Sequence, residues 1–197
     1  MRKLVVSEFM SLDGVIQAPG GADEDRDGGF RHGGWTIPFW HDDIGRTFAS
    51  LMQGVDAFLL GRRTYVTHAE AFEPMPAGDF FGDLMNAPAK YVVSRTLEKP
   101  IWRRTTILRD EVMGRVRALK AEPGGTILTD GSSQLVRALI PEGLVDELHL
   151  LVYPIVLGGG KRIFPEGGVD SRFALEKVTP YPSGVVGLHY RRPSGTP

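Results

Sequence analysis

Three apolar runs in this chain each end at small, hydroxylated or basic residues. The turns after them are Gly61-Arg62-Arg63-Thr64, Ser94-Arg95 and Gly131-Ser132-Ser133, following runs at 57–60, 91–93 and 126–128. Such runs predict buried strands, and helix-like sequence follows the first and third turns. A Gly or Ser turn between a strand and a helix directs free backbone N–H groups at one spot, where the helix dipole also favours an anion. The sequence therefore predicts three strand ends suited to phosphate.

Three such ends on neighbouring strands would line one edge of a sheet, which is where open α/β sheets bind ligands. A dinucleotide is the simplest ligand that needs several anion contacts along an extended groove. NAD sites carry an acidic residue where Ser94 and Arg95 stand, so this pair favours NADP. Taken singly, each turn has a simpler interpretation: a surface turn, ordinary strand-end polarity, or a helix N-cap at Ser132 or Ser133.

The periodicity alternates strands with helices and then continues mostly as strands. Strands are expected at 4–10, 57–60, 90–93, 105–108, 145–156, 172–178 and 185–191, and helices at 42–53, within 61–71, at 110–121 and at 132–140. This order predicts an α/β fold with a mainly parallel sheet and an antiparallel end. The length suits one domain spanning 1–197, with 193–197 frayed. The glycine-rich stretch Ala18–Gly34 is a loop, and loops of this length are usually functional or disordered.

Composition excludes several classes of function. The net charge of −1, from 23 basic and 24 acidic residues, gives no basic excess for nucleic acid or an anionic membrane. The absence of cysteine excludes disulfides, zinc thiolate sites and thiol chemistry. The N-terminus reaches the charged Glu8 too soon for a signal peptide, and no apolar stretch approaches the roughly 20 residues of a membrane helix. We therefore expect a cytoplasmic protein.

Two familiar motifs are incomplete or missing. Gly158-Gly159-Gly160-Lys161 is not a phosphate loop, because Ile155 and Arg162 stand where that motif needs Gly and Ser or Thr. The GxGxxG fingerprint is also missing. The five histidines, at 32, 41, 68, 149 and 189, show neither H-x-H nor H-E-x-x-H spacing. Each is interpreted as a surface or loop residue, and no metal site is expected.

Four carboxylates in the first quarter of the chain are candidate site residues. Glu8 is expected on the apolar face of the first strand, so it is either an end-of-strand exception or a site residue. Asp13 follows that strand, where it is either a simple turn former or part of the site. Asp42 and Asp43 are interpreted as helix caps.

The motifs together resemble one known superfamily. The matching segments are Ser11-Leu12-Asp13-Gly14-Val15, Leu60-Gly61-Arg62-Arg63-Thr64-Tyr65, Tyr91-Val92-Val93-Ser94-Arg95, Gly131-Ser132-x-x-Leu135-Val136, and the runs 143–148 and 154–162. In this order they resemble the dihydrofolate reductase-like superfamily. The resemblance is closest to the branch related to the reductase domain of the bifunctional riboflavin-biosynthesis deaminase/reductase. It implies a single-domain α/β fold with a mixed, mainly parallel central sheet flanked by helices.

The resemblance also implies a site. NADPH would be bound by Gly61, Arg62, Thr64, Ser94, Arg95, Gly131, Ser132 and Leu135, with the nicotinamide towards the first strand. Asp13 and Trp40 would lie in the substrate pocket. Family members reduce pterins or ribosylaminopyrimidines by hydride transfer, and many are homodimers. Dihydrofolate reductases proper carry a pterin-gripping carboxylate where this chain has Trp40, so dihydrofolate is expected to be a poor substrate.

Two functions from different classes remain open. The first is an NADPH-dependent reductase of a small heterocyclic or carbonyl substrate. The second is a nucleotide-binding sensing or scaffold protein of the same fold without efficient chemistry. The reductase predicts an open pocket in which Trp35, Phe39 and Trp40 face the nicotinamide, whereas the scaffold predicts that this pocket is filled.

Overall fold

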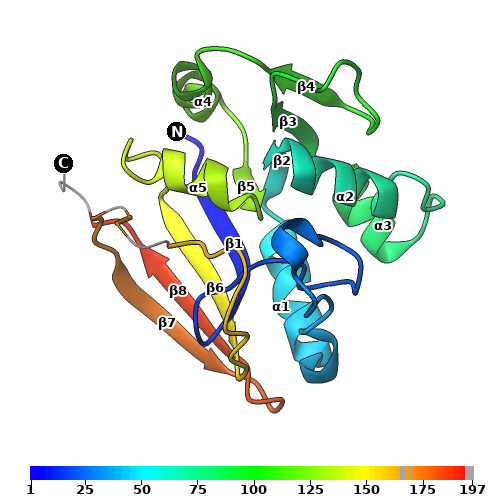
Figure 1. The fold of residues 1–197 in the computed structure, drawn as a ribbon. Coiled ribbons are helices and arrows are strands. Elements are labelled where there is room, and N and C mark those ends of the chain that lie inside the picture. The colour runs from blue at the N-terminus through cyan, green and yellow to red at the C-terminus, as the bar shows by residue number, and fades with distance from the viewer. Residues whose placement is uncertain (165–166, 169, 194–197) are drawn as a thin grey trace.

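An eight-stranded mixed sheet forms the centre of the fold (Figure 1). In spatial order its strands are β4 (Thr105–Leu108), β3 (Ala89–Val93), β2 (Val55–Gly61), β5 (Thr126–Asp130), β1 (Leu4–Ser11), β6 (Glu147–Tyr153), β8 (Val186–Arg191) and β7 (Ala174–Pro180). The strands from β4 to β6 in this order are parallel, and β8 pairs antiparallel with both β6 and β7. The computed structural model describes residues 1–164, 167–168 and 170–193. The predicted fold class, mainly parallel with an antiparallel end, is confirmed.

Helices cover both faces of this sheet (Figure 1). They are α1 (Asp42–Met52), α2 (Arg62–Phe72), α3 (Phe80–Asn86), α4 (Val112–Ala121) and α5 (Ser133–Leu139), with single 3-10 turns at Asp27–Gly29 and Ile37–Phe39. Helices α4 and α5 contribute Val116 and Val136 to the core on one face. Helices α2 and α3 contribute Tyr65 and Met85 to the core on the other face. Every helix in the described part of the chain is too short or too polar to span a lipid bilayer.

Strand β2 shows why the sequence of a central strand can be an unbroken run of apolar residues. Phe58 and Leu60 lie in the core beneath α2, whereas Ala57 and Leu59 lie in the core beneath α5. All four side chains are at most 1% exposed. Because successive side chains alternate between two covered faces, the positions of β2 from Ala57 to Leu60 are all apolar.

The structure differs from the sequence prediction at short elements. Helix α3 was not predicted, because its seven residues are too few to show a helical apolar period. Its N-cap is Asp79, whose carboxylate accepts a hydrogen bond from Gly82 N at 2.7 Å. Helix α1 is capped by His41, whose Nδ1 accepts from the N–H of Asp43, so the capping role given to Asp42 and Asp43 is wrong.

The C-terminal part of the chain keeps its predicted order with shifted bounds. Strand β6 covers 147–153 instead of 145–156, since Pro154 follows it and cannot donate to a ladder. The final pair is confirmed at Ala174–Pro180 and Val186–Arg191. Of the tail expected to fray, residues 194–197 lie outside the described residues.

The parallel register brings the carboxyl ends of six strands to one edge of the sheet, and the five from β3 to β6 carry the turns and loops of the site. Strands β3, β2, β5, β1 and β6 are neighbours in that order, so their carboxyl ends lie side by side. At a spacing of about 4.8 Å, these five ends span about 19 Å. The turns at 94–95, 61–64 and 131–132 occupy the first three positions, which confirms that they adjoin. We call them the strand-end turns.

Candidate functional site

One hydroxyl ties the turn after β2 to the turn after β5. Ser132 Oγ accepts a hydrogen bond from Gly61 N at 2.8 Å and lies 2.8 Å from Thr64 Oγ1. Ser132 stands at the N-cap position of α5, as predicted, but its side chain makes no capping bond to the helix. A Cβ at position 61 would lie only 2.7 Å from Ser132 Oγ, so the contact requires glycine there. These bonds hold the two turns in one fixed arrangement.

Gly131 is required by both its backbone and its neighbours. Its φ of +89° lies in the left-handed region that favours glycine. A Cβ built there would meet Thr64 Cγ2 at 3.0 Å. Ser132 follows with a φ of +74°, so two successive left-handed residues turn the chain from β5 into α5. This turn brings backbone, free of side chains, to the sheet edge.

Two carboxyl groups flank the Gly131 turn from opposite faces of the sheet. Asp130 turns towards α2, where its carboxylate lies 3.1 Å from His68 Nε2. Glu8 of β1 is buried at the other face, and its Oε1 has no partner among the described residues. Burial and the nearby charge of Asp130 raise the pKa of Glu8 well above its ordinary value, although the N–H of Gly131 acts in the other direction. Glu8 is therefore a buried acid at the site, held towards its neutral form.

The arginines at the strand ends differ in what they bind. Arg62 and Arg95 are exposed, and their side chains make no hydrogen bond or ion pair with any described residue. Arg63 instead forms an ion pair with Asp27 of the loop 18–34. Hydrogen bonds from Arg63 and Lys161 lower the pKa of Asp27 to about 2. Two cationic side chains are thus left available for a ligand, and the third holds the loop.

Ser94 shapes the turn that carries Arg95. Its side chain is buried, and its Oγ accepts hydrogen bonds from the N–H groups of Thr96 at 3.2 Å and Leu97 at 2.9 Å. The hydroxyl therefore already has two donors within the protein. Its predicted role in cofactor binding stays a prediction, and its observed role is to position Arg95.

A buried glutamine holds down the loop 18–34, which we call the latched loop. Gln17 is 4% exposed, and its Nε2 donates to the carbonyl oxygens of Asp25 and Asp27, each at 3.0 Å. Its Oε1 accepts from Lys161 N at 3.0 Å. The ammonium group of Lys161 pairs with both of these aspartates. The glycine-rich stretch is therefore an ordered wall of the site, fixed to the loop after β6.

Asp13 performs a similar task in the turn after β1. Its carboxylate accepts hydrogen bonds from Ser11 Oγ at 2.7 Å and from the N–H groups of Leu157 at 3.1 Å and Gly158 at 2.9 Å. Burial raises the pKa of Asp13, but these hydrogen bonds outweigh it and lower the pKa to about 2. Arg162 Nε donates to the Asp13 carbonyl oxygen. The carboxylate is thus ionised and committed to joining two loops, which makes Asp13 a positioning residue.

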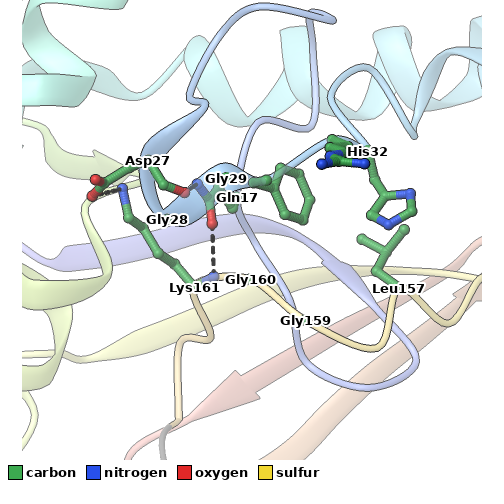
Figure 2. A pocket seen from close by; sticks show the side chains of 11 residues that line it. Gln17, Asp27, Gly28, Gly29, His32, Leu157, Gly159, Gly160 and Lys161 are labelled. Atoms are coloured by element: carbon green, nitrogen blue, oxygen red, sulfur yellow. Dashed lines mark hydrogen bonds and ion pairs between the residues drawn. The ribbon is translucent and has the colours of Figure 1, made fainter.

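A cavity of about 530 Å³ opens between the latched loop and the loop after β6 (Figure 2). It is lined by Gln17, Asp27, Gly28, Gly29, Phe30, Arg31, His32, Leu157, Gly159, Gly160 and Lys161. Figure 2 shows Lys161 directed at Asp27 at one end and His32 above Leu157 at the other. The cavity therefore has an ion pair at one end and an imidazole over an apolar side chain at the other, and Arg31 adds a further charge to the lining. Its walls follow β1 and β6, so it continues the edge occupied by the strand-end turns.

The aromatic lining of this cavity differs from the sequence prediction. Trp35 is buried and packs edge-on against Tyr153, with ring centroids 5.4 Å apart. Phe39 packs against the same ring at 6.1 Å. Trp40 is 48% exposed and lies outside the residues that line the cavity. The predicted lining is wrong because Trp35 and Phe39 form a core behind the latched loop, and the loop itself supplies the aromatic side chains.

Three further residues differ from the sequence prediction in where they lie or what they do. Leu135 is 7% exposed in the core beneath α5, so it supports the Gly131 turn from inside. His149 and His189 lie within β6 and β8 with side chains 28% and 27% exposed, so they are partly exposed strand residues and not loop residues. Sequence reasoning missed Gln17, because nothing near it in the chain distinguishes it from any loop glutamine.

Comparisons with known proteins show the family and the fold. Residues 2–187 match the family described as the RibD C-terminal domain. The chain belongs to this family. The Bacillus subtilis (strain 168) protein named "Uncharacterized protein YyaP" is 29% identical over 194 residues, covering 96% of this chain and 94% of that protein. "Uncharacterized protein YwjB" of the same strain is 28% identical over 192 residues, covering 97% and 98%.

Solved structures share the fold of this RibD C-terminal domain. A putative riboflavin biosynthesis protein from Shewanella sp. PV-4 superposes with a TM-score of 0.68 at 20% identity, covering 97% of this chain and 99% of that one. A pyrimidine reductase-like protein from Corynebacterium diphtheriae gives 0.63 at 16%, covering 96% and 91%. Dihydrofolate reductase from Enterococcus faecalis, complexed with NADP(H), gives 0.63 at 17%, covering 96% of each chain. The dihydrofolate reductase-like fold is thereby confirmed.

Proposed function

We propose that this RibD C-terminal domain is an NADPH-dependent reductase of a small heterocyclic or carbonyl substrate. The observation that carries the proposal is the alignment of three strand-end turns and an open cavity along one edge of a parallel sheet. That edge is where open α/β sheets bind ligands. The family match and the fold shared with an NADP(H)-bound dihydrofolate reductase support the same cofactor.

The residues at the strand-end turns suit a ligand with two separate anionic groups. Arg95 offers unpaired, charge-assisted donors for a 2′-phosphate, which NADPH has and NADH lacks. Arg62 and the free backbone N–H groups at the start of α2 suit a pyrophosphate. Because the N–H of Gly131 already faces Glu8, we assign the main pyrophosphate contacts to α2. Gly131 contributes by its lack of a side chain.

The cavity suits the substrate. Its volume of about 530 Å³ lies within the range of roughly 300–1,000 Å³ typical of small-molecule sites. Bound NADPH supplies a hydride, and the chain's own residues orient the acceptor: His32 and Leu157 offer stacking and apolar contact, and Arg31, which has no partner among the described residues, offers a charge. We assign the predicted site residue Asp13 to positioning, because it holds Leu157 and Gly158 in the cavity wall.

Titration with both dinucleotides tests the proposal. A charge-assisted contact contributes roughly 1.5–3 kcal/mol, so we expect NADPH to bind at least about tenfold more tightly than NADH. Equal dissociation constants would remove the assignment of Arg95. A nucleotide sensor or scaffold would also prefer NADPH, so turnover is measured separately with pterins, aminopyrimidines and carbonyl compounds. The cavity is open, but Trp35, Phe39 and Trp40 do not line it as the reductase interpretation predicts, so turnover decides between the two functions. Binding without turnover on every substrate class would favour the sensor.

Dihydrofolate should be a poor substrate for this reductase. The position of the pterin-gripping carboxylate holds Trp40, which is half-exposed and outside the cavity lining. We expect kcat/KM for dihydrofolate to stay below about 10⁴ M⁻¹s⁻¹, the lower end of ordinary enzymes. Efficient steady-state turnover would show that another residue binds the pterin.

We also propose that the protein is a homodimer, as the family resemblance implies. The edge strand β7 exposes Leu175 at 52% and Val178 at 50%, and exposed apolar edges favour pairing. Light scattering after gel filtration should give twice the chain mass of 21.6 kDa. A mass of one chain at micromolar concentration would contradict the dimer.

A further inference from the structure

Three side chains that can bind a metal meet near the amino end of strand β6, away from the sheet edge that carries the proposed site. His149 of β6 and His189 of β8 are directly paired across the antiparallel ladder. Glu147 lies two residues before His149 on the same strand, and therefore on the same face of the sheet. The sequence separates the two histidines by 40 positions, so only the pairing of β6 with β8 brings them together. None of these residues touches the cavity or the strand-end turns.

One carboxylate oxygen faces both imidazoles. Glu147 Oε2 lies 3.3 Å from His149 Nε2 and 3.2 Å from His189 Nε2. The three ligand atoms all lie within 4.8 Å of one another. A tetrahedral ion with ligand bonds of about 2.1 Å holds its ligands about 3.4 Å apart. The two oxygen–nitrogen separations already match this value. The two imidazole nitrogens, which lie within 4.8 Å of each other, would close around the ion by side-chain rotation.

The charges around the cluster leave the inward-facing oxygen free for an ion. Lys3 Nζ lies 2.7 Å from Glu147 Oε1, and Arg191 Nε lies 3.5 Å from the same oxygen. Both cations thus hold the oxygen that the histidines do not face, and they orient the carboxylate as outer partners do in metal sites. Glu176 Oε2 lies 3.8 Å from His189 Nε2, so a second carboxylate is close enough to add negative charge.

Glu147 is the most buried member of the cluster, and the two histidines are more exposed to solvent. The Glu147 side chain is 7% exposed, whereas His149 and His189 are 28% and 27% exposed. An ion between them would therefore be held from below by the carboxylate and would keep an open position towards solvent. Water or Glu176 can complete a four-coordinate shell there.

We propose that Glu147, His149 and His189 form a binding site for a divalent first-row transition metal of the Zn²⁺ type. Two imidazoles and one carboxylate are ligands that Zn²⁺, Co²⁺, Ni²⁺ and Cu²⁺ accept, whereas Mg²⁺ and Ca²⁺ prefer oxygen ligands alone. The ion links β6 to β8, so it joins the parallel sheet to its antiparallel end. This site is independent of the proposed reductase activity.

Calorimetry and thermal unfolding of the untagged, chelator-treated protein test the site. With ZnCl₂ as the probe, we expect one ion per chain. A free concentration of about 100 times the dissociation constant should raise Tm by roughly 5–10 °C. MgCl₂ at the same concentration should leave Tm unchanged. His149→Asn and His189→Asn should each weaken Zn²⁺ binding by at least about 100-fold, since even outer-shell changes cost 10–100-fold.

His41→Asn is the matched control, because asparagine keeps the cap of α1 while removing a histidine elsewhere. This variant should bind Zn²⁺ as tightly as the parent chain. If the parent chain shows no Zn²⁺ binding, or if both strand variants and the control bind equally, the proposal is overturned. If one strand variant fails to fold, the other and Glu147→Gln give the same test.

Discussion

The strand-end turns and the cavity lie along the same sheet edge, yet they use charge in opposite ways. At the turns, Arg62 and Arg95 are exposed and unpaired within the described chain. Around the cavity, Asp27 and Lys161 are paired within the protein, and of the charged side chains in the lining only Arg31 has no partner among the described residues. The turns therefore keep charge available for an anionic ligand, and the cavity uses charge to hold its own walls.

This difference assigns cofactor binding to the strand-end turns and the shape of the substrate cavity to the two loops. The turns need rigid backbone that lets a ligand approach closely, which Gly61 and Gly131 provide. The cavity needs its two loops to stay together, and Gln17 and Lys161, 144 residues apart in sequence, provide that. Breaking the turns should then affect cofactor binding, whereas breaking the loop contacts should affect the cavity and leave cofactor binding intact.

The largest effect is expected at the turns, from Gly131→Val. The variant forces a β-branched residue into a backbone conformation with φ +89°, and its Cβ would lie 3.0 Å from Thr64 Cγ2. We expect a loss of about 2–4 kcal/mol in unfolding free energy and at least tenfold weaker NADPH binding. Urea unfolding without cofactor separates the two effects.

Ser132→Ala is the milder companion, because it removes only the bonds to Gly61 N and Thr64 Oγ1. It should cost about 1–2 kcal/mol of stability. A folded Gly131→Val variant that binds NADPH normally would show that this turn serves the fold alone.

Gln17→Met is the corresponding change in the cavity. Methionine has a similar shape but leaves the carbonyl oxygens of Asp25 and Asp27 and the N–H of Lys161 without their partner. We expect a loss of about 2–3 kcal/mol and faster hydrogen exchange in the latched loop, with NADPH affinity changed less than threefold.

The matched control is Gln53→Met, at an exposed position. It should change neither the stability nor the hydrogen exchange of the latched loop. If Gln17→Met weakens NADPH binding as much as Gly131→Val does, the separation of the two halves is wrong.

Arg95→Ala sharpens the account of the turns. Removing an unpaired, exposed guanidinium costs the fold little, so Tm should stay within about 1 °C of the parent. NADPH affinity should fall about tenfold while NADH affinity stays the same. Lys99→Ala, an exposed change in the same connection, should affect neither cofactor. Equal losses for both cofactors would place Arg95 away from the 2′-phosphate.

The smallest effect concerns Glu8, at the boundary between the two halves. Burial raises its pKa in the folded state above the 4.5 of an exposed glutamate, so the folded chain binds more protons than the unfolded chain. Stability is then fully present below pH 4.5 and is lost as the pH rises towards the raised value. Glu8→Gln should flatten this decline above pH 4.5, as urea unfolding at each pH would show. An unchanged slope would show that Glu8 is ionised in the folded state.

Local signals explain which parts of the fold and site could be predicted from sequence. The apolar run ending at Leu60, and the glycine and serine after β5, mark strand ends that the structure places side by side. Both faces of β2 are buried, so its sequence is an unbroken apolar run that indicates a central strand. The resemblance of several motifs in order then gave the superfamily, which the family match confirms.

Long-range contacts explain the rest. Gln17 gains its role only from Lys161, and Trp35 leaves the cavity only because Tyr153 lies behind it. His149 and His189 become neighbours only through the register of β6 and β8. No spacing along the chain encodes these pairs, so a search for histidine motifs could not find them.

A crystal structure with NADPH bound tests the central claim most directly. We predict the 2′-phosphate against Arg95 and the pyrophosphate between Arg62 and the Gly131 turn. The nicotinamide should point past the end of β1 towards the cavity beneath the latched loop. The Gln17 contacts should be unchanged by binding. NADPH bound away from the carboxyl ends of β3, β2 and β5, or adenine in place of nicotinamide at the cavity, would contradict the account.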